Sequence, residues 1–246
     1  MRYWLNSPDK RENPEEFARR STAICDVYAA APELHLQGTH TVCTDEKTGM
    51  QALERAAATL PMKPGQIERQ EADYIRHGTQ VLTGNFEVAT GKVICPTIGD
   101  TRNEQDFAAH IAQTVASDPQ APWIFVVDQL NTHQSKTLVQ LVATLCGITD
   151  CLGIKGESGI LESMATRRDF LEDKTHRIHF VYTPRHASWL NQIEIWFSIL
   201  ARRVLRRGNF TSTANLREKL EAFIDYFNNT MAKVFKWTYK GKPLTI

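Results

Sequence analysis

The apolar run Trp123–Val127 is the feature that most limits how this 246-residue chain can fold. All five side chains are apolar, so both faces of a strand formed here would be apolar, and Pro122 precedes the run while a polar loop follows it. A strand of that kind belongs at the centre of a sheet that is covered on both faces. Asp128 follows directly. Because burying an unpaired carboxylate costs several kcal/mol, roughly, we expect Asp128 to lie in solvent at the sheet edge or to face a cation.

Hydrophobic periodicity and breaker residues predict the other elements. Strands are expected at 39–44, 78–90, 92–98 and 178–182, with a hairpin turning at Thr90–Gly91, a turn after Asp45 and a short irregular or helical stretch at 51–60. Helices are expected from Asn13 towards Pro32, around Glu194, and at 104–116, 135–145 and 215–228. A meander of strands followed by alternating strands and helices predicts an α/β fold, with a mixed sheet flanked by helices on both faces.

Two further carboxylates are candidates beside Asp128, one at a strand end and one on a helix. Asp45 follows a run of alternating β-formers, and Glu194 lies at the border of an apolar helical stripe formed by Leu190, Ile193, Phe197, Leu200 and Val204. Mg²⁺ prefers oxygen ligands, and phosphodiester chemistry can use two such ions roughly 3.5–4 Å apart. A single Asp after a strand is more often a turn or helix-cap residue, so the prediction of a metal-dependent phosphodiester enzyme depends on the three carboxylates together.

Long strings in this sequence resemble one protein family. They are TDEKTGMQALER, VVDQLNTHQS, FVYTPRHASWLNQIEIWFSILARR and FKWTYKGKPL, together with Arg2-Tyr3-Trp4-Leu5 near the start. The chain resembles the catalytic domain of bacterial insertion-sequence transposases of the mariner-like superfamily, which are DDE superfamily endonucleases with a ribonuclease-H-like fold. The resemblance implies that Asp45, Asp128 and Glu194 are the catalytic carboxylates and bind two Mg²⁺ or Mn²⁺ ions.

The resemblance also implies supporting positions near the metal for His133, Asn131 and Asn191. His133 would orient a phosphate or a bound water beside Asp128, although loop histidines are more often capping or solvated. Asn191 would anchor the Glu194 carboxylate or a metal-bound water, and a polar role at the helix N-terminus is the competing interpretation. Glu46 is excluded as a primary ligand because neighbouring strand residues point to opposite faces.

The chain departs from the family pattern in two ways. Gln129 follows Asp128 where the family usually has Asn, and Asn131 comes two residues later. The 65 residues between Asp128 and Glu194 exceed the usual spacing. We assign the excess to an insertion at about 147–177, expected to be an exposed loop with a short helix that either lies on DNA or is solvated without contacts. The chain then divides into an N-terminal helical linker segment, 1–38, and a catalytic domain, 39–246.

The net charge of +1 hides an uneven distribution. Residues 185–246 hold 11 Lys and Arg against 4 Asp and Glu, a net +7, which leaves −6 on the first 184 residues. We expect double-stranded DNA to contact this basic end, at Arg185, His186, Arg202, Arg203, Arg206, Arg207, Lys236 and Lys240. A solvated helix face is the alternative for the four later arginines, and a tail packed on the core is the alternative for 236–242. Trp189 and Trp196 are expected in the core.

The resemblance implies a transposase domain that hydrolyses DNA strands at the element ends and transfers the freed 3′-hydroxyl to target DNA, at TA dinucleotides, as a homodimer. Family members carry a helix-turn-helix region ahead of this domain. The alternatives are therefore a non-catalytic DNA-binding or regulatory remnant of a transposase, or a stand-alone nuclease with the same metal site.

Location and cysteine chemistry follow from composition. No apolar run approaches the ~20 residues of a membrane span, and Met1–Lys10 lacks a signal-peptide core, so we expect a protein of the bacterial cytosol and nucleoid. The five cysteines lack zinc-ligand spacing. We expect buried free thiols and no structural zinc.

Overall fold

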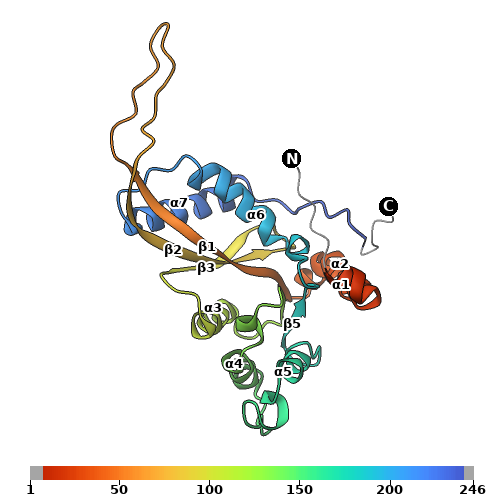
Figure 1. Ribbon diagram of the computed structural model, residues 1–246. Helices are drawn as coiled ribbons and strands as arrows, with labels where there is room; N and C mark the ends of the chain where they lie inside the picture. Colours follow the sequence, from red (N-terminus) through yellow and green to blue (C-terminus); the bar gives the residue numbers. More distant parts are fainter. Residues whose placement is uncertain (1–7, 241–246) are drawn as a thin grey trace.

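The computed structural model of the protein describes residues 8–240 (Figure 1). Residues 1–7 of the expected linker segment and 241–246 of the expected catalytic domain, including Arg2–Leu5, lie outside the described residues. The described part contains one five-stranded sheet of order β3-β2-β1-β4-β5. Its strands are β1 (His40–Arg55), β2 (Tyr74–Glu87), β3 (Val93–Gly99), β4 (Trp123–Val127) and β5 (Ile178–Tyr182). β1, β2 and β3 pair antiparallel, whereas β4 is parallel to both of its neighbours, so the sheet is mixed as predicted.

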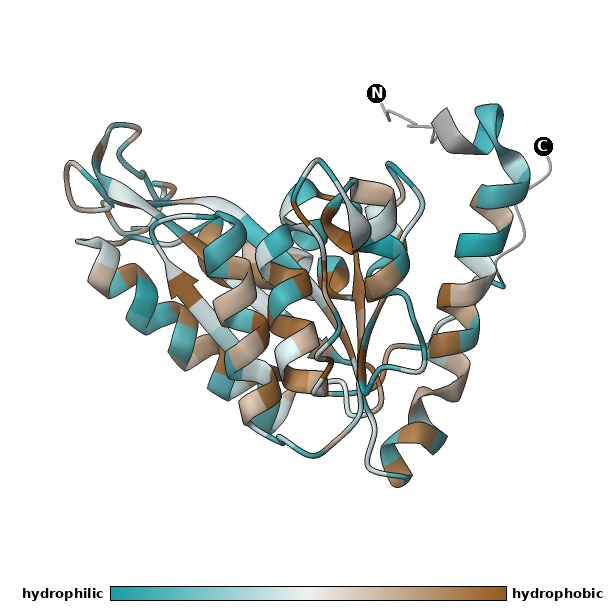
Figure 2. Cartoon of the chain, turned by 90° about the horizontal axis from the view of Figure 1, so that it is seen from below, coloured by the Kyte–Doolittle hydropathy of each residue, from teal (hydrophilic) through white to brown (hydrophobic). Residues whose placement is uncertain are grey.

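β4 is the central buried strand that the sequence predicts. Ile124 and Val126 pack into one core, and Trp123, Phe125 and Val127 pack into the other. The first core is covered by α2 (Pro14–Leu36), α6 (Ile193–Leu200) and α7 (Thr213–Thr230). The second is covered by α3 (Glu104–Ala116), α4 (Lys136–Cys146) and α5 (Met164–Leu171). Figure 2 shows apolar strands between these helices, whose outer faces are largely polar.

β1 continues past Asp45 to Arg55. The predicted turn at DEKTG is therefore wrong, and so is the predicted irregular or helical stretch at 51–60 for its first five residues. Gly49 has φ +67°, and the register with β2 shifts between Lys47 and Met50. Glycine therefore forms a bulge that the strand passes through instead of a turn that ends it. Beyond Arg55, residues 56–73 form a projecting arm that leaves the body of the protein (Figure 1).

Helix boundaries agree with the sequence for α3, α4 and α7 and differ at the N-terminal end. α1 (Pro8–Glu12) precedes α2, and α2 runs to Leu36 with Pro32 inside it. Proline removes one backbone donor, and a single lost hydrogen bond so close to the C-terminus does not end the helix. No helix in residues 8–240 is both long and apolar enough to cross a membrane.

The insertion at 147–177 contains the expected short helix, α5, but it is not a solvated excursion. Leu161 and Leu171 are buried in the second core. The Arg167 guanidinium is also buried, and it donates from Nε to the Gln134 carbonyl (2.8 Å) and from a terminal nitrogen to the Leu161 carbonyl (3.1 Å). The segment is therefore bound to the turn that follows Asp128.

The five cysteines form no disulfides, and all of them lie in residues 8–240. Only Cys43 is buried, whereas Cys25, Cys95 and Cys146 are half-buried and Cys151 is exposed. The expectation that the thiols are buried is therefore wrong for most of them.

Candidate active site

Asp45 and Asp128 lie on neighbouring parallel strands at the same edge of the sheet. Cys43 pairs with Val126 in the β1–β4 register, so Asp45 and Asp128, two residues further on, come to the same level. Asp45 is mostly buried, with 8% of its surface exposed, and Asp128 is half-buried just after β4. The edge where two parallel strands end is a common position for a ligand site.

Glu194 reaches this edge from the other layer, in the first turn of α6. Gly84, which pairs with Asp45, carries no side chain, and a Cβ placed there would lie 3.4 Å from Cδ1 of Ile193. α6 therefore packs closely on the strand pair beside Asp45. The three carboxylates come from within β1, from the residue after β4 and from α6, and they share one region of the molecule. The positions of Asp128 and Glu194 agree with the sequence prediction, whereas Asp45 lies inside a strand that continues past it.

Mutual repulsion and burial perturb two of these carboxylates. Burial raises the pKa of Asp45 to about 7, with the charge of Asp128 adding to the effect. Burial also raises the pKa of Glu194; Lys47 opposes this shift and Asp128 adds to it. A carboxylate beside two others resists ionisation, because burial and the neighbouring negative charges both disfavour its charged form. The all-oxygen donor set and this excess of negative charge both fit divalent ions such as Mg²⁺ or Mn²⁺.

His133 holds Asp128 in its charged form. It lies in a single 3₁₀ turn, Asn131–Gln134, and its ring is fully buried against Phe107, with 4.1 Å between ring centroids. Nδ1 is 2.7 Å from Asp128 Oδ1, and Nε2 is 3.1 Å from Glu46 Oε2. Burial alone would lower the pKa of His133, but the two carboxylates outweigh it and raise this pKa to about 10.

The effect on Asp128 is reciprocal. Burial would raise the pKa of this carboxyl, but the hydrogen bond and charge of His133 hold it below its ordinary value. The structure therefore has a buried His133 that contacts Asp128, not the capping or solvated histidine that was the alternative.

Glu46 is the residue that sequence reasoning missed. It does point away from Asp45, as expected for the next strand residue, yet its side chain is only 2% exposed and contacts His133. An acidic pair on a strand, followed much later by a loop histidine, was a signal too weak to identify this contact. Glu46 is placed to support Asp128 indirectly, through the imidazole.

Asn191 connects the two elements that carry Asp45 and Glu194. Its Nδ2 donates to the Thr44 carbonyl (3.0 Å), and its backbone carbonyl accepts from the Glu194 amide (3.1 Å). Its Oδ1 is buried without a hydrogen-bond partner in the part of the chain that the structure describes. The Asn191 amide thus fixes the start of α6 to β1, and its Oδ1 is available to a water molecule.

A cavity of about 720 Å³ opens beside Asp128. Asn131 is exposed on its wall, and Arg185 and His186 line it from the loop after β5. α5 lines the other side with Met164, Ala165 and Arg168, so the insertion contributes directly to this space. Asn131, expected near the metal, and Arg185 and His186, expected on DNA, therefore surround one opening. His133, also expected near the metal, is instead buried.

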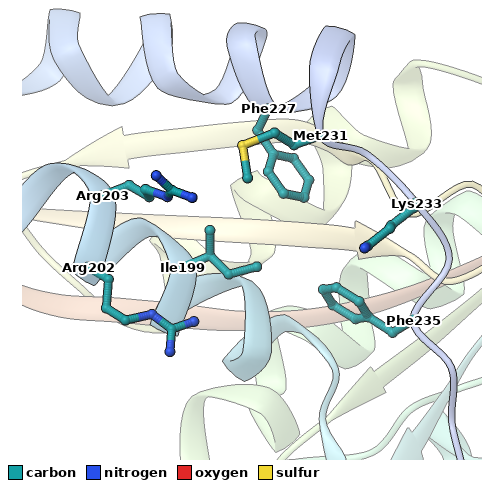
Figure 3. Close-up of a pocket in the computed structure, with 7 residues that line it drawn as sticks. All are labelled: Ile199, Arg202, Arg203, Phe227, Met231, Lys233 and Phe235. Carbon is teal, nitrogen blue, oxygen red and sulfur yellow. The ribbon is translucent and has the colours of Figure 1, made fainter.

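The arginines after Glu194 are all exposed, and α6 ends in a π-helical turn, Ala201–Leu205, that carries the first two of them. Arg202 and Arg203 border a cavity of about 520 Å³ whose apolar floor includes Phe227 and Phe235 (Figure 3). Arg207 lines a separate pocket at the base of the projecting arm. The four arginines thus spread from the α6–α7 groove to the arm and do not form a single patch.

The C-terminal segment packs on the core through its aromatic residues. Phe235 stacks on Phe86 with 4.5 Å between centroids, Trp237 meets Tyr28 edge-on at 5.0 Å, and Tyr239 meets Trp189 at 5.0 Å. Lys236 and Lys240 alternate with these rings and are exposed. The packed-tail alternative therefore holds for the aromatic residues and leaves the lysines facing solvent.

Trp196 is fully buried, as expected, but Trp189 is 51% exposed, so its assignment to the core is wrong. Trp189 lies in a short 3₁₀ turn, Ser188–Leu190, directly ahead of α6. Leu190 takes the buried position there, and Trp189, next to it, faces outward against the tail.

Comparison with known families agrees with this geometry. The sequence profile described as DDE superfamily endonuclease matches residues 40–217, more than half of the chain and the region that carries all three carboxylates. The chain belongs to the DDE superfamily endonuclease family. No curated protein sequence matches this DDE endonuclease chain.

Several solved structures similar to the DDE endonuclease chain are structures of Mos1. A Mos1 mariner paired-end complex with Mn gives a TM-score of 0.53 at 15% identity, over 91% of this chain and 57% of that one. The Mos1 strand transfer complex gives 0.53 at 14% identity, over 92% and 57%. The catalytic domain of Mos1 mariner transposase gives 0.51 at 12% identity, over 92% and 85%.

At these identities the likeness concerns the fold, and the ribonuclease-H-like fold expected from the sequence is confirmed. The chain spans 57% of the length of the Mos1 chains in the two DNA-processing complexes and 85% of the Mos1 catalytic domain.

Proposed function

We propose that this DDE endonuclease chain is the catalytic domain of a transposase. It would cleave DNA strands at the ends of a mobile element and join the freed 3′-hydroxyl to target DNA, at TA dinucleotides. The observation that carries the proposal is the meeting of Asp45, Asp128 and Glu194 at one sheet edge, with the pKa of Asp45 raised by burial and by Asp128. That electrostatic state is typical of a site built for metal ions.

Asp45, Asp128 and Glu194 would hold two Mg²⁺ or Mn²⁺ ions. Among residues 8–240, these three carboxylates are not a set whose ligand atoms all lie within 4.8 Å of one another, and a two-ion site does not require that. When bound, such ions lower the pKa of an attacking water and stabilise the leaving oxygen. A similar Mos1 structure contains Mn, which supports this choice of metal.

The protein's own residues would orient the reaction. His133 would keep Asp128 ionised and fix the orientation of its carboxylate, because Nδ1 contacts Asp128 Oδ1. Glu46 Oε2 holds the imidazole in place through Nε2. Asn191 ties Glu194 to the Asp45 strand. Arg185 and His186, on the cavity beside Asp128, would bind backbone phosphates of the strand that is cut.

Double-stranded DNA is the proposed partner, with further phosphate contacts at Arg202, Arg203, Arg206, Arg207, Lys236 and Lys240, all exposed. The proposed location is the bacterial cytosol and nucleoid, where such DNA would be found. A similar solved structure, the Mos1 transposase paired-end complex with left transposon end, supports this choice of partner.

A homodimer is part of the proposal, because transposition acts on two ends. The projecting arm, residues 56–73, supports it. Leu60, Met62 and Ile67 are largely exposed there, at 61%, 75% and 79% of their surface. Apolar side chains presented on an arm away from the body are typical of a contact with another chain.

The test is incubation of the purified chain with Mn²⁺, supercoiled plasmid and a labelled oligonucleotide that ends in a 3′-hydroxyl. Label joined to plasmid is the result that the proposal predicts. Metal-dependent nicking without joining would make the chain a stand-alone nuclease. DNA binding with neither product would favour the non-catalytic DNA-binding or regulatory alternative.

A further inference from the structure

Three side chains of metal-binding type meet at the end of the sheet opposite the catalytic carboxylates. His35 lies in the last turn of α2, His40 is the first residue of β1, and Glu87 is the last residue of β2. One ligand atom from each lies within 4.8 Å of the other two, and no other group in residues 8–240 meets this condition. His40 Nδ1 is 2.7 Å from Glu87 Oε1, and His35 Nδ1 is 3.7 Å from the same oxygen.

We propose that His35 Nδ1, His40 Nδ1 and Glu87 Oε1 bind one zinc ion. Zinc takes imidazole nitrogen and carboxylate oxygen at ~2.0–2.2 Å in a tetrahedral arrangement, which separates the donor atoms by about 3.3 Å. The observed separations of 2.7 and 3.7 Å lie on either side of that value, so small side-chain rotations suffice. The His35 side chain is 37% exposed, so water can reach the fourth position.

The surroundings of Glu87 and His40 select the atoms that face the ion. Thr90 Oγ1 donates to Glu87 Oε2 at 2.6 Å, which leaves Oε1 for the metal. His40 Nε2 lies 3.4 Å from Asp118 Oδ2, and the ring stacks on Trp123 with 4.2 Å between centroids and 18° between planes. A carboxylate on the far nitrogen of a histidine fixes its tautomer and makes the near nitrogen a better ligand.

The cluster has the composition of a zinc site and not of a second magnesium site. Two of its three donors are imidazole nitrogens, which suit zinc, whereas Mg²⁺ demands oxygen. Zinc would take the place of the direct contact between His40 Nδ1 and Glu87 Oε1. The ion would join the end of α2 to β1 and β2 and so attach the N-terminal helix to the sheet.

The prediction of no structural zinc considered only the cysteine spacing. His35 and His40 are five residues apart and Glu87 is 47 residues after His40, so the sequence did not indicate this cluster. The proposed zinc site does not depend on the proposed transposase activity. A loss of zinc binding and a loss of DNA cleavage can therefore be separated.

The experiment is calorimetric titration of Zn²⁺ into a metal-stripped chain that carries Asp45→Asn, Asp128→Asn and Glu194→Gln, so that the catalytic carboxylates contribute nothing. We expect one zinc per chain, a higher unfolding temperature with zinc, and no change with Mg²⁺. His35→Ala, at a half-buried side chain that belongs to neither core, lowers zinc affinity at least about a hundredfold, and Asp118→Asn lowers it about 10–100-fold.

A matched control is His77→Ala. His77 Nε2 lies 2.7 Å from Glu54 Oε2 in a histidine–carboxylate pair that belongs to no three-ligand group in the described part of the chain. Its removal leaves zinc affinity unchanged. Absence of saturable zinc binding, or equal affinity in the parent chain, His35→Ala and His77→Ala, would overturn the proposal and leave the cluster as a proton-sharing group.

Discussion

His133 Nδ1 lies 2.7 Å from Asp128 Oδ1, and this contact sets the charge state of the site. The imidazole has carboxylates on both nitrogens, so both nitrogens donate and the ring carries a positive charge. This buried cation therefore contacts Glu46 and Asp128, and Asp45 and Glu194 add two more carboxylates beside Asp128. The remaining negative charge is what divalent ions would neutralise.

Glu46→Ala is expected to destabilise the protein. It leaves His133 Nε2 buried without an acceptor, which costs about 1–3 kcal/mol of unfolding free energy. Glu46→Gln keeps an amide oxygen in reach of Nε2 and loses less. Urea denaturation of the two variants measures the difference. Equal midpoints for Glu46→Ala and the unmodified chain would show that the contact contributes nothing.

Arg167→Met tests whether the insertion is held to the turn after Asp128. The substitution keeps the apolar stem, leaves the Gln134 carbonyl without its Arg167 donor and leaves the Leu161 carbonyl with only the Gly156 amide at 3.3 Å. This is expected to cost about 1–3 kcal/mol. Arg76→Met, at an exposed arginine of β2, is the matched control and should change the urea midpoint little. Similar midpoints for both variants would contradict the assigned role of Arg167.

Gly91→Ala tests the packing of the C-terminal segment. Gly91 has φ +71°, and a Cβ there would collide with the Lys233 carbonyl. Gly38 has φ +84° with nothing near a Cβ, so Gly38→Ala carries only the left-handed backbone cost of about 1–2 kcal/mol. Gly91→Ala should lose more stability and increase amide hydrogen exchange around Trp237. Equal effects of the two substitutions would mean that the segment is not packed there.

His110 is expected to make the protein less stable in acid. Burial, with a contribution from the charge of His133, lowers the pKa of His110 from 6.5 to about 3. The unfolded chain therefore takes up a proton below pH 6.5 that the folded chain refuses until about pH 3. The free energy of unfolding therefore falls by up to about 1.4 kcal/mol per pH unit as the pH drops through this window. Above pH 6.5 the full stabilisation is present.

His110→Gln removes that proton uptake and can keep the hydrogen bond to Thr97 Oγ1. Urea midpoints at pH 6.5 and pH 5 should show that the unmodified chain loses about 2 kcal/mol more than the variant. An identical pH dependence for both would mean that His110 does not govern this window.

The sequence predicted those parts of the fold that local pattern determines. The alternation of Ile124 and Val126 with Trp123 and Phe125 marks a strand buried on both faces, and the parallel pairing of β4 with β1 then brings Asp128 level with Asp45. The amphipathic runs of α3, α4 and α7 were equally clear.

What the sequence did not reveal depends on contacts between distant residues. Whether Gly49 ends β1 or bends it depends on β2, and whether Trp189 is buried depends on the tail. The Glu46–His133 contact spans 87 residues, and the His35, His40 and Glu87 cluster forms only when α2, β1 and β2 meet. Such pairings have no periodic signal in the sequence.

We propose that Asp45, Asp128 and Glu194 form one metal-dependent site for cutting DNA. Its most direct test is the rate of supercoiled-plasmid nicking with Mn²⁺, compared between the unmodified chain, Asp128→Asn and the exposed-residue control Asp225→Asn. Losing a direct ligand should cost more than the 10–100-fold typical of outer contacts. We predict nicking that stops in EDTA, falls more than about a hundredfold in Asp128→Asn and is unchanged in Asp225→Asn, whereas equal nicking by all three proteins would contradict the account.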